Sequence, residues 1–417
     1  MTSTTVGTSR ARPAPSRGLS GALQSWLERP LSSYYLLLGS AGLLVALGLV
    51  MVLSASSVTS YASSGSSFTI AEKQAMWVAI GLPALWIGMR LPIRFYRFLG
   101  YPLLFGALGL LVLVLVPHVG VRVAGATRWI ALPAGLQVQP SELAKLALVL
   151  WGADLLARKD KRLGEVRHLL IPLVPLALLM ALLVMMEPDM GTTIVLVLTM
   201  LALLWSAGSP VSVFGATGLL LGGGLGLLAI TEPYRLARLT GFANPCAAAQ
   251  AQKAGYQACQ GLIALSSGGW FGLGLGASRE KFGYLPNQYT DYIFAIIGEE
   301  LGLLGTFVVL LLFAVLGYAG IRIAQRCRDR FSQLAAAGVT AWLLGQALVN
   351  MGAVVGLLPI TGIPLPMVSF GGSALVPTLF AVGMLASFAR REPGAAEALS
   401  ARRAGRRQAM RRRLRSV

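Results

Sequence analysis

The sequence predicts an all-α polytopic membrane protein with about ten transmembrane helices and both termini in the cytoplasm. Of its 417 residues, 55% are hydrophobic and only 12% are charged, and the mean hydropathy is +0.70. A soluble globular protein carries about 25% charged residues, so the composition excludes that class. Most of the 35 Lys and Arg residues lie in the tails or between apolar runs. The net charge of +19 therefore indicates a membrane topology and not a partner nucleic acid.

Apolar runs long enough to cross the hydrocarbon core, which takes about 20 helical residues, define the predicted helices. They span residues 34–53, 74–90, 99–117, 141–157, 169–186, 191–207, 211–230, 291–320, 333–357 and 374–390. The uncharged stretch 190–231 is too long for one helix, and Gly208 and Pro210 divide it.

The positive charges predict the orientation, because loops rich in Lys and Arg stay in the cytoplasm. With the N-terminus inside, the basic segments and both tails lie on the cytoplasmic side. We expect a basic N-terminal tail of residues 1–33, a ten-helix membrane domain of residues 34–390 and an Arg-rich C-terminal tail of residues 391–417. The external connections are mostly long or rich in Gly and Pro, so we expect any chemistry on the external side.

The largest external loop, between the seventh and eighth predicted helices, covers about residues 231–290 and contains Cys246 and Cys259. An external loop meets an oxidising compartment, so we predict a disulfide between them. The alternative is two unpaired thiols buried as small hydrophobic side chains. The spacing of the cysteines fits no metal site.

Three carboxylates, Asp291, Glu299 and Glu300, stand in the external part of the helix predicted at 291–320. An ionisable side chain at membrane depth costs several kcal/mol unless it is paired, solvated or functional. At about 100° per residue the three do not share one face, so they cannot all serve one role. We assign Asp291, nearest the external surface, as a candidate general base, with a structural salt bridge as the alternative. Glu299 and Glu300 are expected to be ion-pair or packing groups.

A second external group follows the third predicted helix. Arg128 and Trp129 precede Glu142 and Lys145, which are three residues apart and share a helix face. The pair can bind a substrate or form a local ion pair, and the spacing leaves both readings open.

Two irregular segments complete the external side. Glu187 and Asp189 lie at a junction broken by Pro and Gly, and broken backbone at membrane depth is tolerated where it lines a cavity. Residues 358–373, which include Ser369, are rich in Pro and Gly and are predicted to dip into the protein before the last helix.

Five segments of the sequence, in their order along the chain, resemble the shape, elongation, division and sporulation family of bacterial cell-wall polymerases. The resemblance is carried by residues 125–145, 187–191, 267–274, 285–302 and 364–373. Two features depart from the family pattern: Tyr289 stands where members often have His, and the cysteine pair is not typical of members.

The resemblance implies a peptidoglycan glycosyltransferase that polymerises lipid II into glycan strands and releases undecaprenyl pyrophosphate. It implies that Asp291 takes the proton from the acceptor hydroxyl. The candidate substrate-binding residues are Arg128, Trp129, Glu142, Lys145, Glu187, Asp189, Arg279, Lys281 and Ser369. The family analogy also implies a divalent cation, Mg or Mn, to which we assign no ligands, and no organic cofactor.

The resemblance further implies that the chain works in the bacterial plasma membrane, at the division septum, with a class B penicillin-binding transpeptidase and other division proteins. The long basic tails favour the division members of the family over the elongation members. Two alternatives from other classes are a lipid II flippase, whose path would use Glu142, Lys145, Glu187 and Glu300, and a structural scaffold for division partners.

Overall fold

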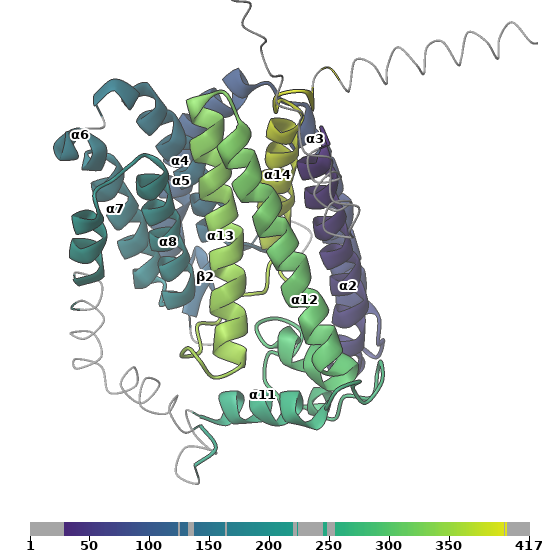
Figure 1. Ribbon diagram of the computed structural model, residues 1–417. Helices are drawn as coiled ribbons and strands as arrows, with labels where there is room; N and C mark the ends of the chain where they lie inside the picture. Colours follow the sequence, from purple (N-terminus) through teal and green to yellow (C-terminus); the bar gives the residue numbers. More distant parts are fainter. Residues whose placement is uncertain are drawn as a thin grey trace, which may run out of the picture.

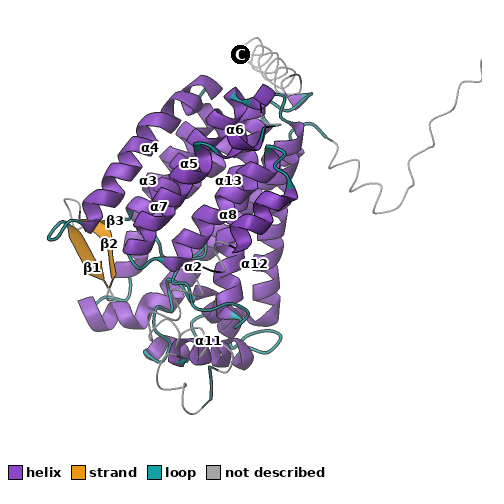
Figure 2. Cartoon of the chain, turned by 90° about the vertical axis from the view of Figure 1, so that its left-hand side faces the viewer, coloured by secondary structure: helices purple, strands orange, loops and turns teal. Residues whose placement is uncertain are grey.

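The computed structural model describes residues 29–123, 126–131, 137–162, 165–219, 223, 245–247, 255–395 and 397. The described chain is a bundle of helices with a small sheet at one end (Figures 1 and 2). The helices are α2 (Ser32–Ser64), α3 (Thr69–Arg90), α4 (Ile93–Leu115), α5 (Pro140–Arg158), α6 (Val166–Leu170), α7 (Leu173–Met186), α8 (Met190–Ser206), α11 (Tyr256–Ser267), α12 (Ile293–Arg326), α13 (Arg330–Val354) and α14 (Gly372–Ala389), with 3₁₀ turns η2 (Asp160–Arg162) and η3 (Glu280–Phe282).

Six described helical segments are long and apolar enough to cross a membrane: α2, α4, residues 167–186, α12, α13 and α14. The apolar helix α8 is shorter, at 17 residues. The chain is therefore a multi-pass membrane protein. Of the helix predicted at 211–230, residues 211–219 are helical and the rest, apart from Gly223, lie outside the described residues.

The first span is longer than the apolar pattern predicts. The prediction ends at residue 53, whereas α2 continues to Ser64 through a stretch rich in serine. Ser64 Oγ donates to the Ser60 carbonyl at 2.8 Å, so this hydroxyl is satisfied by its own helix. The end of an apolar run is therefore not the end of the helix.

α12 is broken at Gly302, where φ is 68° and ψ is −165°, so the single helix predicted at 291–320 is two helical pieces. A neighbouring segment fills the break. The Leu273 N–H donates to the Glu299 carbonyl at 2.9 Å, and the Leu303 N–H donates to the Gly269 carbonyl at 2.9 Å. Backbone groups at membrane depth need partners, and these bonds replace the ones that the helix loses. We call residues 268–283 the inserted segment.

The prediction of an all-α fold missed a three-stranded antiparallel sheet in order β1-β2-β3. Its strands are β1 (Gly120–Val123), β2 (Ala126–Ala131) and β3 (Gln137–Val138). Val121 pairs with Trp129 and Ile130 pairs with Val138. The strands are too short to show in a search for membrane-spanning runs, but β-branched and aromatic side chains favour the extended backbone. The sheet and α11 lie at the same end of the bundle (Figure 2).

Ion pairs gather where α5 ends and α13 begins, at the end of the bundle away from α11 (Figure 1). The buried Asp154 accepts from Arg97 Nε and Arg158 Nε, each at 2.6 Å. Arg330 Nε donates to Asp160 at 2.9 Å. The two ends of the bundle thus differ in chemistry: one concentrates basic side chains, and the other carries the sheet, α11 and the inserted segment.

Candidate active site

A cavity of about 520 Å³ lies where α3, the sheet, α8 and the loops before α12 and α14 meet. Its lining includes Asp291, Arg128, Trp129 and Asp189, which the sequence singled out, and Lys73, which it did not. Asp291 lies in the turn just before α12, which begins at Ile293. The prediction that Asp291 opens the helix is therefore off by two residues, and the carboxylate stands on a loop that borders the cavity.

Asp291 is held by contacts of the backbone around it. The Asn287 carbonyl accepts from the Thr290 and Tyr292 N–H groups at 3.1 and 3.2 Å, which closes the turn. Asn350 Nδ2 donates to the Asp291 carbonyl at 2.7 Å. Burial raises the pKa of the Asp291 carboxyl to about 6, while Arg128 lowers it and Asp189 adds to the rise. A carboxylate with this pKa is ionised at neutral pH yet accepts a proton more readily than an ordinary aspartate.

Arg128 projects from β2 and is fixed by main-chain carbonyls. Its Nε donates to the Glu187 carbonyl at 3.2 Å, and its Nη2 donates to the Pro188 carbonyl. Its Nη1 lies 3.9 Å from Asp189 Oδ1. A methyl group built on Gly362 would lie 3.6 Å from Asp291 Oδ2 and 3.9 Å from Arg128 Nη1, so the acid and the cation flank this glycine.

Glu187 and Asp189 have different environments although they are two residues apart. Asp189 lines the cavity and caps α8 by accepting from Thr192 N at 3.1 Å. Gln139 Nε2 donates to its other oxygen at 3.0 Å. Glu187 is fully buried, and neither of its carboxylate oxygens has a hydrogen-bond partner among the described residues. Burial, reinforced by Asp189 and opposed by Arg128, raises the pKa of Glu187 to about 8, so this side chain is largely neutral at pH 7.

Glu142 and Lys145 form the local ion pair that their spacing allowed. Lys145 Nζ lies 2.8 Å from Glu142 Oε1 and donates to Gln346 Oε1 at 2.7 Å. The same ammonium lies 5.3 Å from the centre of the Trp342 ring. Both charged side chains are buried between α5 and α13, and neither lines the Asp291 cavity.

Arg279 and Lys281 belong to the inserted segment and do not line the cavity. Lys281 is buried; its Nζ donates to the Gly276 carbonyl and lies 3.8 Å from Glu300 Oε1. The Arg279 side chain is exposed, and its backbone N–H donates to Glu299 Oε1 at 2.8 Å. In this structure both cations therefore lie apart from Asp291.

Glu299 and Glu300 are paired packing groups, as expected. Ser278 Oγ donates to Glu299, and Ser54 Oγ donates to both oxygens of Glu300 at 2.7 Å. Both carboxylates are buried. They fasten the inserted segment and α2 to the first piece of α12.

Ser369 does not line the cavity, but it holds the loop that forms part of the cavity wall. Its Oγ accepts from the Leu365 N–H at 2.8 Å, and the side chain is buried. The five residues that follow it, Phe370 to Ala374, line the cavity. The Phe370 N–H also donates to the Tyr289 carbonyl at 2.9 Å, which joins this loop to the turn that carries Asp291.

Sequence reasoning missed Lys73, Thr192 and Asn350. Lys73 is an exposed cation near the start of α3, directly after Glu72. Glu72 and Lys73 directly precede the helix predicted at 74–90, and this position was a usable signal. Asn350 lies within an apolar run, and a buried amide there needs a hydrogen-bond partner.

Cys246 and Cys259 form a disulfide, with their Cα atoms 4.9 Å apart. Cys327 is a free, buried thiol.

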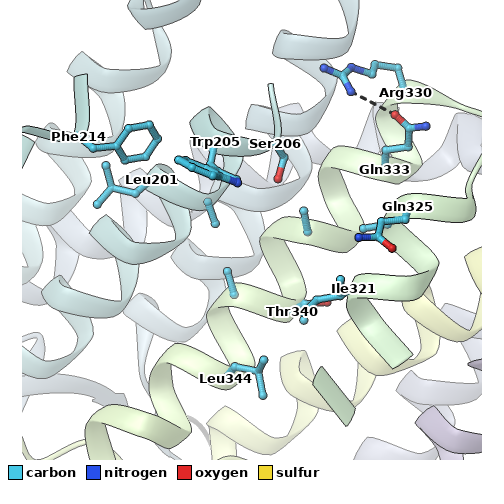
Figure 3. Close-up of a pocket in the computed structure, with 14 residues that line it drawn as sticks. Leu201, Trp205, Ser206, Phe214, Ile321, Gln325, Arg330, Gln333, Thr340 and Leu344 are labelled. Carbon is cyan, nitrogen blue, oxygen red and sulfur yellow. Dashed lines mark hydrogen bonds between the residues drawn. The ribbon is translucent and has the colours of Figure 1, made fainter. Parts of the chain in front are cut away.

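A larger cavity of about 660 Å³ lies between α8, α12 and α13 (Figure 3). Apolar side chains such as Trp205, Phe214 and Leu344 dominate its lining, and Arg330 there donates to Gln333 at 3.2 Å. None of its described lining residues is acidic. The Asp291 cavity is smaller, but it combines two acids, two cations and aromatic walls, which is the pattern of an active site.

The chain matches the FtsW, RodA and SpoVE family, described as cell cycle proteins, over residues 34–393. A probable peptidoglycan glycosyltransferase FtsW from Mycobacterium tuberculosis is 44% identical over 382 residues, which cover 92% of this chain and 72% of that protein. Stage V sporulation protein E of Bacillus subtilis is 40% identical over 349 residues, 84% of this chain and 94% of that protein. A chain from a structure described as a peptidoglycan synthase complex that coordinates polymerization and crosslinking has a TM-score of 0.69 and 27% identity, over 85% of this chain and 96% of that one.

Proposed function

The chain belongs to the FtsW, RodA and SpoVE family, and we propose that this peptidoglycan glycosyltransferase polymerises lipid II in the Asp291 cavity. One observation carries the proposal. Asp291 borders a cavity of about 520 Å³ beside Arg128, and burial raises its pKa to about 6. A general base works best when its pKa lies near the operating pH, so this carboxylate is suited to accept a proton from a sugar hydroxyl.

In the proposed reaction, Asp291 takes the proton from the 4-hydroxyl of the acceptor sugar as that oxygen attacks the anomeric carbon of the donor. The bond between the anomeric carbon and the pyrophosphate oxygen breaks with inversion, and undecaprenyl pyrophosphate leaves with the electron pair. The proton remains on the Asp291 carboxyl until water removes it. Proton transfer to a positioned base contributes typically about 10²–10⁴-fold to such a rate.

Two cations in the cavity suit the pyrophosphate groups of the lipid-linked donor and acceptor. Arg128 is held in place by the Glu187 and Pro188 carbonyls, which aligns its guanidinium in advance. Lys73 lines the same cavity and forms no ion pair within the part of the chain that the structure describes. Fixed positive charge aimed at a departing pyrophosphate stabilises the negative charge that develops there.

A divalent cation stays an expectation from the family. Among the described residues, no three His, Cys, Asp or Glu side chains converge as a metal site would require. The two acids of the cavity, Asp189 and Asp291, both interact with Arg128. The residues therefore do not fit a cation cage built by the protein, and we derive no step through a metal.

We further propose ten spans with cytoplasmic termini, an external cavity and a role in septal wall synthesis with a class B penicillin-binding transpeptidase. The basic ion pairs at the ends of α5 and α13 support the sidedness, because positive segments are retained in the cytoplasm. A cavity at the opposite end would then open to the compartment in which glycan strands grow. The relatives named FtsW support the division role.

A flippase path through Glu142, Lys145, Glu187 and Glu300 has less support. Glu142 is bonded to Lys145, and Glu300 is bonded to Ser54. None of the four lines the Asp291 cavity.

The test is reconstitution of the purified chain with its transpeptidase and lipid II, comparing wild type with Asp291→Asn. We expect polymer from wild type and a loss of about 10²–10⁴-fold in the variant. The variant must elute and melt like wild type. Equal polymer from both proteins would remove Asp291 as the base. No polymer from either, with lipid II transport intact in the same liposomes, would favour the flippase.

A further inference from the structure

Asn350, a buried amide on α13, bridges two loops of the active site. Its Nδ2 donates to the Asp291 carbonyl at 2.7 Å and to the Ile363 carbonyl at 2.8 Å. Both partners are carbonyls, which only accept, so the amide must present its NH₂ group to them. An amide nitrogen has two hydrogens, and here each has its own acceptor.

Gln346, one turn earlier on α13, makes the adjoining link. Its Oε1 accepts from Lys145 Nζ at 2.7 Å and from Trp342 Nε1 at 3.0 Å. These groups can only donate, so the orientation of the amide is fixed, and Nε2 donates to the Pro364 carbonyl at 3.0 Å. The buried ion pair of α5 therefore sets the orientation of the side chain that holds residue 364.

These bonds affect the distance and orientation between Asp291 and Arg128. Asn350 joins the Asp291 backbone to Ile363, and the residue before it, Gly362, is flanked by Asp291 Oδ2 and Arg128 Nη1. Asp291 precedes α12, whose first backbone bonds go to the Tyr292 carbonyl. The Asp291 main chain is thus held by the Asn287 turn and by a side chain of α13, and not by the hydrogen-bond ladder of α12.

We propose that Asn350 and Gln346 are positioning residues of the glycosyltransferase, which hold the peptide of residues 362–364 between Asp291 and Arg128 at a fixed spacing. The inference rests on the proposed function of Asp291. Neither amide borders the cavity, so each acts through the backbone it holds and not by touching the substrate. A small displacement of a reacting group from its productive geometry costs about 10²-fold in rate.

The test is the steady-state kinetics of lipid II polymerisation by the reconstituted complex with Asn350→Leu. This variant removes both donors at nearly constant size. We expect kcat to fall by about 10–10²-fold while KM changes by less than about threefold, because substrate contacts remain. A loss confined to KM, or a kcat equal to that of wild type in a protein that melts normally, would overturn the proposal.

Gln346→Glu keeps the proposal testable if Asn350→Leu does not fold. The carboxylate still accepts from Lys145 and Trp342, but it has no hydrogen to donate to Pro364. We expect kcat to fall with KM little changed, and an unchanged kcat in a folded protein would contradict the role of Gln346. In the double variant the losses should be less than additive, because both residues hold the same peptide.

Gln333→Leu is the matched control. Gln333 is on the same helix and donates Nε2 to the Cys327 carbonyl at 2.8 Å, at the other end of α13. This variant loses that bond and the one that Gln333 accepts from Arg330 at 3.2 Å, and it should keep the wild-type kcat. An equal fall in kcat for Gln333→Leu would mean that α13 acts through general stability and would refute positioning. Asp291→Asn, assayed in parallel, separates the two proposals, since activity in that variant contradicts the proposed function itself.

Discussion

The Asp291 cavity and the inserted segment both place acids and cations beside the start of α12, yet only in the cavity does a carboxylate border open space. Beside the inserted segment, Glu300 of α12 accepts from Ser54 at 2.7 Å, and within the segment Lys281 donates to a backbone carbonyl. In the cavity, Asp291 is tied down through its main chain, and its carboxylate borders the open space. Partners that saturate the charged oxygens make a structural site, whereas partners that hold the backbone leave the charge free for chemistry.

The cations of the two regions give the sharpest test. Arg128→Gln removes a guanidinium that lines the cavity, and we expect polymerisation to fall by about 10²–10³-fold, as when one stabilising donor is lost from an active site. Arg279→Gln, an exposed cation of the inserted segment, is the matched control and should stay within about twofold of wild type. Initial rates with lipid II measure both. If Arg279→Gln proved as damaging as Arg128→Gln, the division between the two regions would be wrong.

The acidic side of the pH profile reports on the cavity alone. The reactive form of Asp291 is the carboxylate, which is lost as the pH falls through its pKa of about 6. From pH 7 to pH 4 we expect kcat/KM to fall by about 10²-fold. Stopped-time polymerisation across this range measures it. Glu300→Gln should keep the same profile, and a profile that stays flat to pH 4 would exclude Asp291 as the base.

Glu300→Gln should weaken the contacts of the inserted segment without lowering the polymerisation rate. The change replaces a buried carboxylate that accepts from Ser54 and lies 3.8 Å from Lys281 Nζ. Hydrogen bonds to charged groups contribute about 1.5–3 kcal/mol, so we expect a lower melting temperature in detergent. The polymerisation rate per folded molecule should stay near that of wild type. A large fall in rate without a change in melting would show that Glu300 takes part in the reaction.

Gly362→Ala is the mildest change to the cavity. Gly362 has a φ of +71°, which costs a residue with a Cβ about 1–2 kcal/mol. The added methyl group meets Asp291 and Arg128 only at contact distance, at 3.6 and 3.9 Å. We therefore expect a small loss of stability and a severalfold fall in kcat, measured by melting and by initial rates. Gly208→Ala, with a φ of +90° and open space around it, should lose similar stability and no activity.

Much of the fold and part of the site could be predicted, because they depend on local properties of the chain. Apolar length marked the spans, since a helix must bury about 20 residues to cross the bilayer. The position of an acid at the start of an apolar helix predicted Asp291 as a site residue. The family-like segment of residues 125–145 predicted Arg128. These signals can be read along the sequence without knowing what any residue contacts.

Other features depended on contacts between residues far apart in the sequence. Lys145 looked like a substrate-binding cation, but Gln346 and Trp342 enclose it in the core. The break at Gly302 is stable only because the inserted segment supplies the missing bonds. Neither the enclosure of Lys145 by α13 nor the break at Gly302 can be predicted from the spacing of residues along the sequence.

By itself, the sequence determined that the chain is a multi-pass helical membrane protein with an acid at the head of a late helix, because apolar length and isolated charge are local quantities. Only the tertiary structure decided which charges are available. It brought Lys73, Arg128 and Asp291 to one cavity and gave Glu300 and Lys145 their partners. The physical reason is that a buried charge is stable only when neighbours satisfy it, and packing alone determines which neighbours those are.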